Sequence, residues 1–140
     1  MYKKILVAID GSANALYSLD QAVGLANGFG KDVEMTVFHV THIDISEYTV
    51  QLGIDRLRRE EGEAVLAAAQ PYLDKAKFRH ESVVIPGDPA QEIYERAKAG
   101  GYDLIVMGNR GRSLVTELLL GSVSHKVLQQ AHCPVLIVRR

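Results

Sequence analysis

The stretch that decides the fold is MGNRGRSLVTELLLGSVSH at residues 107–125. It places Gly108 and Gly111 directly after an apolar run, and it sets Gly121 immediately before Ser122. Glycine is used where the backbone needs a positive φ, or where another group must come closer than a Cβ atom allows. The spacing G-x-x-G-x(9)-G-S therefore predicts a loop with a special backbone between a strand and a helix.

Working outward from this stretch, the chain contains short apolar runs of strand length. Most of these runs are continuous and do not alternate between apolar and polar residues, which is typical of parallel strands covered by helices on both faces. The predicted strands are residues 3–9, 33–40, 82–85, 103–107 and 134–138.

The segments between these runs have helical periodicity. Ser12 and the Asp88–Pro89 pair are typical helix starts, and Gly100 is a typical helix end. The last helix is expected from Ser122 to about Ala131. The expected sheet-facing positions are Ala15, Leu16, Leu19, Ala22, Val23 and Ala26 in the first helix, Ile54, Leu57, Ala64, Val65, Ala68 and Tyr72 in the second, Ala90, Ile93 and Ala97 in the third, and Val123, Val127 and Leu128 in the fourth.

The predicted order βαβαβαβαβ indicates an α/β fold with three layers, in which helices cover both faces of an open parallel five-stranded sheet. In such sheets, ligands bind beyond the carboxyl ends of the strands, where the strand order reverses. Asp10 follows the first strand, while Met107 and Gly108 end the fourth. The sequence thus predicts a ligand site at the carboxyl ends of these two strands.

The glycine-rich stretch has the properties of a phosphate site. A glycine loop exposes backbone N–H groups, and the first turn of the following helix adds unpaired donors and the positive end of the helix dipole. The hydroxyls of Ser122 and Ser124 are further candidate donors, and Arg110 is a candidate source of positive charge. We therefore interpret the stretch as a phosphate-binding loop.

Length and composition indicate one ordinary globular domain spanning residues 1–140. The 140-residue chain is 47% hydrophobic and 24% charged, and its net charge of −1 gives no basic surface for nucleic acid. Cys133 is the only cysteine, which excludes an internal disulfide and fits a reducing compartment. No apolar run approaches the length of about 18 residues that a membrane span requires. These features favour a cytoplasmic protein that binds neither membrane nor nucleic acid.

Other ligand motifs fit the chain poorly. It contains neither G-x-x-x-x-G-K-[ST] nor G-x-G-x-x-G, so neither a P-loop nor a common dinucleotide site is expected. His39 and His42 lack the cysteine or carboxylate partners that would complete a zinc site. No histidine is placed by the sequence to activate Ser12, for which a helix cap is the better interpretation.

The spacing G-x-x-G-x(9)-G-S, together with KKILVAIDGS, FHV, VVIPGDPAQEI, DLIVMGNRG and LLLGSVSHKVLQQAHCPVLIV, resembles the ATP-binding branch of the universal stress protein family over nearly the whole chain. The resemblance implies the sheet order 3-2-1-4-5, ATP as ligand and a role in the stress response. It implies an adenosine contact at Ala8, Ile9 and Asp10, with Asp10 also near Mg²⁺. The other implied contacts are Val40 to adenine, Met107 and Gly108 to ribose, and Arg110, Gly111, Gly121, Ser122, Val123 and Ser124 to the phosphates.

Several functions remain open at this point. The resemblance favours a nucleotide-dependent sensor or regulator, without catalytic residues and with at most weak ATP hydrolysis. The alternatives are a slow ATP hydrolase or phosphotransferase, for which Glu117 is a weak candidate, and a protein of the same fold that binds another small ligand. In the implied sheet order, residues 134–138 form an apolar edge strand, so we also expect a homodimer paired at this edge.

Overall fold

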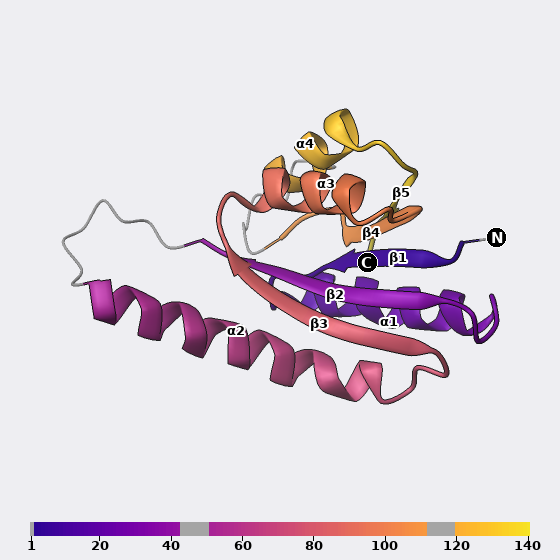
Figure 1. The fold of residues 1–140 in the computed structure, drawn as a ribbon, viewed down its shortest axis with the longest axis horizontal. Helices are drawn as coiled ribbons and strands as arrows, with labels where there is room; N and C mark the ends of the chain where they lie inside the picture. Colours follow the sequence, from indigo (N-terminus) through magenta and orange to yellow (C-terminus); the bar gives the residue numbers. More distant parts are fainter. Residues whose placement is uncertain (1, 43–50, 112–119) are drawn as a thin grey trace.

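The structure is a computed structural model in which residues 2–42, 51–111 and 120–140 are described (Figure 1). Strands and helices alternate along these residues. None of the helices in these three segments is both long and apolar enough to cross a membrane. In chain order the elements are β1 (Lys4–Ala8), α1 (Ala13–Asn27), β2 (Glu34–Thr41), α2 (Gln51–Leu73), β3 (Arg79–Pro86), α3 (Pro89–Ala99), β4 (Leu104–Gly108), α4 (Ser122–Gln130) and β5 (Val135–Val138).

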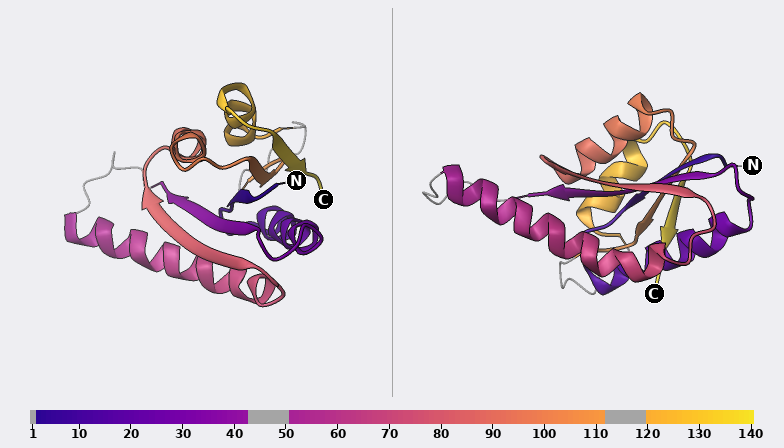
Figure 2. Two further views of the ribbon diagram at one scale, coloured as in Figure 1. Left: turned by 45° about the vertical axis from the view of Figure 1, so that its right-hand side comes forward. Right: turned by 60° about the horizontal axis from the view of Figure 1, so that its bottom comes forward.

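The strands form a single five-stranded parallel sheet in the order β3-β2-β1-β4-β5, which confirms the predicted fold and strand order. β1 lies at the centre, where Ile5 is opposite Met35 of β2 on one side and Leu104 of β4 on the other. Helices α1 and α2 cover one face, and α3 and α4 cover the other (Figures 1 and 2). The chain therefore folds into three layers.

Two apolar clusters fill the spaces between these layers. Successive residues of a strand point to opposite faces of the sheet, so each central strand supplies both clusters. In β1, Val7 packs under α1 and α2, whereas Leu6 packs under α3 and α4. Leu6 and Val7 are both fully buried, which explains the continuous apolar runs in the sequence.

The helix starts follow the capping signals in the sequence. The Ser12 hydroxyl accepts a hydrogen bond from the N–H of Ala15 at 3.1 Å, and the carboxylate of Asp88 accepts one from the N–H of Gln91 at 3.0 Å. Pro89 occupies the first position of α3, where a missing N–H breaks no helical bond. The predicted caps at Ser12 and Asp88 are therefore confirmed.

Strand β3 is longer than the predicted 82–85 run, because it extends from Arg79 to Pro86. It lies at the edge of the sheet, and its first four residues are exposed. An edge strand pairs through its backbone along one side only, so polar side chains such as His80 and Glu81 are tolerated there. Apolar runs alone therefore underestimate the length of this strand.

The buried side of α2 differs from the predicted stripe. Ile54 and Val65 are buried as expected, and Tyr72 packs partly against the core, but Leu57 is 49% exposed. Ala64 and Ala68 are also exposed, whereas Ala69 and Leu73 are buried. Alanine is common in helices because of its propensity as well as its apolar character, so it marks the buried side poorly.

Leu128 of α4 is the other incorrect assignment. Val123 and Val127 pack against the sheet, whereas Leu128 is 41% exposed. Positions 123 and 127 lie four residues apart and share one face of the helix, but position 128 is turned about 100° away from position 127. The contact between α4 and the sheet is too narrow to include it.

Leu19→Ala should lower the free energy of unfolding by about 2–5 kcal/mol, because the fully buried Leu19 fills space between α1 and the sheet. Urea denaturation measures this loss. The matched substitution Leu57→Ala removes the same atoms from a side chain that is 49% exposed, and should change stability by less than about 1 kcal/mol. Equal losses in the two variants would contradict the burial described here.

Candidate functional site

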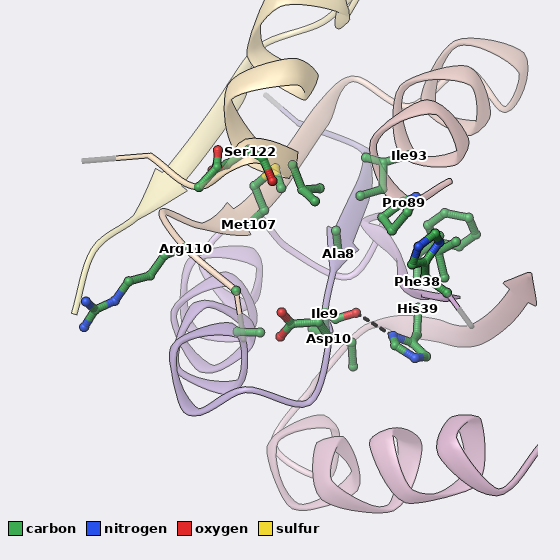
Figure 3. A pocket seen from close by; sticks show the side chains of 18 of the residues that line it. Ala8, Ile9, Asp10, Phe38, His39, Pro89, Ile93, Met107, Arg110 and Ser122 are labelled. Atoms are coloured by element: carbon green, nitrogen blue, oxygen red, sulfur yellow. Dashed lines mark hydrogen bonds between the residues drawn. The ribbon is translucent and has the colours of Figure 1, made fainter. Parts of the chain in front are cut away.

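A cavity of about 320 Å³ lies at the carboxyl ends of β1 and β4, where the chain order of the sheet reverses. In Figure 3, Ala8, Ile9 and Asp10 stand in the middle of this cavity, with Met107 and Ser122 on one side and Phe38 and His39 on the other. The chain passes from β1 to α1 on one face of the sheet and from β4 to α4 on the other face. The two connections therefore separate at this point and leave a crevice between them.

The structure brings all of the sequence-predicted site residues together on the wall of this cavity. They come from the ends of β1, β2 and β4 and from the start of α4, and they are Ala8, Ile9, Asp10, Val40, Met107, Gly108, Arg110, Gly111, Gly121, Ser122, Val123 and Ser124. The wall also includes residues that the sequence did not indicate, namely Ala15, Phe38, His39, His42, Glu61, Pro89 and Ile93.

The glycines after β4 are required by close approach and not by backbone conformation. Gly108, Gly111 and Gly121 all lack a positive φ. A Cβ atom on Gly108 would lie 2.5 Å from the Nδ2 atom of Asn14, and one on Gly111 would collide with the Asp10 carboxylate. These two glycines therefore allow the loop after β4 to pack directly against the polar groups at the start of α1.

Gly121 brings the start of α4 against the same loop. Its N–H donates to the carbonyl of Asn109 at 2.6 Å, and a Cβ atom at this position would lie 3.3 Å from the Cα atom of Arg110. The buried Ser124 hydroxyl is 3.0 Å from the same Asn109 carbonyl and 3.1 Å from that of Gly121, to which it donates. The Ser124 hydroxyl is thus bonded to the backbone, and its predicted contact with phosphate stays a prediction.

The first turn of α4 presents backbone donors at the cavity wall. Gly121 is the N-cap and provides no side-chain cap. The N–H groups of Ser122, Val123 and Ser124 precede the first helical hydrogen bond, which His125 makes to Gly121 at 2.9 Å. Unpaired N–H groups at a helix start, together with the positive end of the dipole, favour an anion.

The two charged residues predicted near the phosphates have different settings. Asp10 is half-buried, and its Oδ1 atom accepts the N–H of Ser12 at 2.9 Å. Arg110 is exposed, and Figure 3 shows its side chain directed away from Asp10. Within the described segments, no group of three or more histidine, cysteine or acidic side chains could hold a metal ion. Two described carboxylates line the cavity: that of Asp10 lies beside Gly111, and that of Glu61 lies beside His39.

Asn14 is a supporting residue that sequence reasoning missed. It is buried in the first turn of α1, and its Nδ2 atom donates to the carbonyl of Arg110 at 2.7 Å and to the Oδ1 atom of Asn109 at 3.1 Å. In the sequence, the only sign of this role is that Asn14 places an amide side chain at the edge of the apolar stripe of its helix. Asn14 ties α1 to the loop after β4, so it fixes the distance between the two halves of the cavity wall.

The sequence assigns no role to His39, since a zinc site is not expected there. Its side chain is 3% exposed and lies on the cavity wall beside Glu61 of α2. The Nδ1 atom is 2.9 Å from the carbonyl oxygen of Ile9, and the Nε2 atom is 3.5 Å from the Oε2 atom of Glu61. His39 therefore connects β1 and α2 across the end of β2.

Cys133 lies outside the cavity and packs partly against the apolar cluster under α3 and α4. Burial, followed by the negative charge of Asp103, raises the pKa of its thiol. A raised pKa lowers the thiolate fraction at neutral pH, and thiolate is the nucleophilic form. This setting agrees with the interpretation of Cys133 as a packed residue.

Residues 1–139 match the sequence model of the Universal stress protein family. The universal stress protein YxiE of Bacillus subtilis is 40% identical over 150 residues, covering 99% of this chain and 100% of the relative. The structure of protein MJ0577 of Methanocaldococcus jannaschii has a TM-score of 0.83 at 30% identity, covering 100% of this chain and 97% of that one. A universal stress protein in complex with cAMP has a TM-score of 0.64 at 25% identity, covering 98% and 97%.

Gly108→Ala should destabilise the protein by about 1–3 kcal/mol, because the new methyl group forces Asn14 away from its buried hydrogen bonds. Urea denaturation measures the change. Gly24→Ala is the matched control, since no atom lies within 4 Å of a Cβ atom at this position within α1. The control should be stabilised by about 0.5–1 kcal/mol. Stabilisation of both variants would contradict the close approach described for Gly108.

Proposed function

The chain belongs to the universal stress protein family, and we propose that it binds an adenine nucleotide, ATP with Mg²⁺, as a cytoplasmic sensor or regulator of the stress response. The observation that carries this proposal is the row of N–H groups at the start of α4, which lies on the wall of a cavity whose floor contains glycine backbone. Such a row favours phosphate over neutral ligands.

The two ends of the cavity suit the two ends of a nucleotide. The α4 end has backbone donors and little side-chain bulk at Gly108 and Gly111, as phosphate groups require. The opposite end has the apolar side chains of Phe38, Pro89 and Ile93 on its wall, with His39 beside Phe38. A flat base gains from burial against such side chains. The related protein solved with cAMP supports adenine as the base.

Asp10 is the residue we assign to Mg²⁺. Magnesium in nucleotide sites is held by one or two carboxylates together with substrate phosphates and water. Asp10 lies on the cavity wall, and its carboxylate sits against Gly111, next to the proposed phosphate position. One carboxylate is therefore sufficient if the phosphates supply the other ligands. When bound, the ion would supply charge neutralisation for the phosphates.

Binding without rapid turnover fits these residues best. In-line phosphoryl transfer needs a positioned water or acceptor as well as charge neutralisation. Among the described residues at the α4 end of the wall, Asp10 is the only carboxylate, and we assign it to Mg²⁺. Glu117, the weak candidate from the sequence, lies outside the described residues. ATP hydrolysis faster than about 1 per second that is lost in Ser122→Ala would instead favour an enzyme.

Ser122→Pro should weaken ATP binding about 10- to 100-fold, because it removes one backbone donor to a charged phosphate. Ser122 is the first residue of α4, where proline preserves the helix, and Gly121 has φ −68° and ψ 166°, which suits a residue before proline. Isothermal titration calorimetry measures the affinity of the purified chain.

Two matched variants complete this test. Ser122→Ala removes only the exposed hydroxyl and should weaken binding less than Ser122→Pro. Ala13→Pro makes the corresponding change at the first residue of α1, which does not line the cavity, and should leave affinity unchanged. Equal affinity of the wild type and Ser122→Pro would contradict the proposed phosphate site. Mass spectrometry of ligand released from the denatured protein would identify a ligand other than ATP.

We also propose a homodimer paired through residues 134–138. β5 is an edge strand, and Leu136 is 38% exposed on it. The carbonyl of Pro134 accepts the N–H of Ile105 in β4 at 3.0 Å, and the carbonyl of Val138 accepts the N–H of Asn109, directly after β4, at 3.1 Å. Alternate residues of a parallel strand bond to the same neighbour. The backbone groups of Val135 and Ile137 therefore face the free edge, where a second copy could pair in antiparallel fashion about Leu136.

Ile137→Pro should shift the chain from dimer to monomer, because it removes an N–H from this free edge. Ile137→Ala is the matched control, since it also loses the side chain that packs partly on the core but keeps the N–H. Sedimentation equilibrium at micromolar concentration distinguishes the two masses. A monomeric wild type, or a dimer that survives in Ile137→Pro, would contradict the proposed interface.

A further inference from the structure

We propose that His39 and Glu61 form a proton-dependent clasp that positions the β1 wall of the cavity, so that nucleotide binding is accompanied by proton uptake at this pair. The proposal rests on the proposed function for its ligand. It concerns positioning residues, because the imidazole acts on the cavity through the carbonyl of Ile9 and through α2. Figure 3 shows the ring of His39 joined to the Ile9 carbonyl by a hydrogen bond.

The geometry fixes the proton on one side of the ring. A carbonyl oxygen only accepts hydrogen bonds, so the contact of 2.9 Å between Nδ1 of His39 and Ile9 requires an Nδ1–H group. The Nε2 atom then faces the Oε2 atom of Glu61 at 3.5 Å, and both atoms are inaccessible to water. If the His39 ring is neutral, the lone pair of its Nε2 atom faces the ionised carboxylate of Glu61. If the ring is protonated, an Nε2–H group faces that carboxylate.

Protonation therefore turns an unfavourable contact into an attractive one. The ring takes this proton from solvent. The protonated ring holds the Ile9 carbonyl on one side and Glu61 on the other, which joins β1 to α2. Loss of the proton favours rotation of Glu61 away from the ring. The contact between α2 and His39 is then lost, and α2 no longer helps to position the β1 wall.

Ligand binding should strengthen the clasp. The Glu61 side chain is 25% exposed, and both partners line the cavity. A bound nucleotide excludes water from this wall, and attraction between opposite charges increases as the local dielectric falls. Among the described residues, the other charged or titratable groups on the wall are Asp10 after β1, His42 after β2 and Arg110 after β4. Arg58 of α2 lies one turn before Glu61, and the β3 residue opposite His39 is the uncharged Val84.

Glu61→Gln separates proton dependence from simple packing. The glutamine amide can donate an N–H to Nε2 of the neutral His39 ring, so at high pH the contact forms without a proton on Nε2. At low pH the glutamine carries no negative charge to stabilise the buried imidazolium. The matched control is Glu63→Gln, which makes the same change at an exposed position of α2 that does not line the cavity. His42 is unchanged in both variants, so it contributes equally to both.

The first measurement is the urea midpoint of the full chain without ligand, at about pH 6 and pH 8.5, on either side of the range in which histidine titrates. Relative to the wild type, Glu61→Gln should have a lower midpoint at the acidic pH and an equal or higher midpoint at the alkaline pH. Glu63→Gln should follow the wild type at both. A difference between Glu61→Gln and the wild type that is the same at both pH values overturns the clasp.

The second measurement is the affinity for cAMP, whose phosphodiester does not titrate near neutrality. The wild type should bind about three- to tenfold more tightly at about pH 6 than at about pH 8.5, and this ratio should fall towards one in Glu61→Gln. In calorimetry, the wild type should take up protons on binding, as detected with buffers of different ionisation enthalpy. Proton uptake that is the same in Glu61→Gln and the wild type overturns the coupling.

The two measurements distinguish the possible failures. Absence of cAMP binding by the wild type at both pH values counts against an adenine-nucleotide site and removes the coupling, while the urea midpoints still decide whether the clasp exists. Binding that has no pH dependence, with the expected midpoints, overturns only the coupling. His39→Asn provides a further check, because its amide keeps a donor for Ile9 and has no titratable ring, so its ratio of cAMP affinities at the two pH values should equal that of Glu61→Gln.

Discussion

The carbonyl of Asn109 determines where α4 begins, and the arrangement of the cavity depends on this one acceptor. It receives the N–H of Gly121 at 2.6 Å and the hydroxyl of Ser124 at 3.0 Å. Both donors belong to the start of α4, whereas Asn109 directly follows β4. The two hydrogen bonds therefore hold the N-terminus of the helix at the carboxyl end of β4, with its free N–H groups at the cavity wall. A helix that started elsewhere would point these donors to solvent.

Glycine on both sides allows these two segments to approach each other closely. Gly108 and Gly111 allow the loop to meet Asn14 and Asp10 of the neighbouring crossover, and Gly121 allows α4 to meet the loop. At these three positions a Cβ atom would meet Asn14, Asp10 or Arg110, so the absence of Cβ atoms serves the close packing of these segments.

Polar side chains that lie inside the layers connect elements distant in the sequence. Asn14 joins α1 to the loop after β4, and His39 joins the end of β1 to α2. Each is buried, and a buried polar group contributes best when its partners are present and well placed. The two residues support opposite ends of the cavity, so its shape depends on hydrogen bonding as well as on apolar packing.

Much of the fold followed from the sequence alone, because continuous apolar runs, Ser12, Asp88–Pro89 and the glycine spacing are local signals with local physical causes. They indicated parallel strands, helix starts and a loop in which glycine is necessary, while the strand order came from the family resemblance. The tertiary structure decided the rest. It showed that the buried side of α2 includes Ala69 and excludes Leu57, that the Ser124 hydroxyl is used by the backbone, and that His39 meets Glu61. These features depend on which elements meet in space, and a polar partner 15 residues away, as for Ser124, or 22 residues away, as for His39, leaves no periodic signal in the chain.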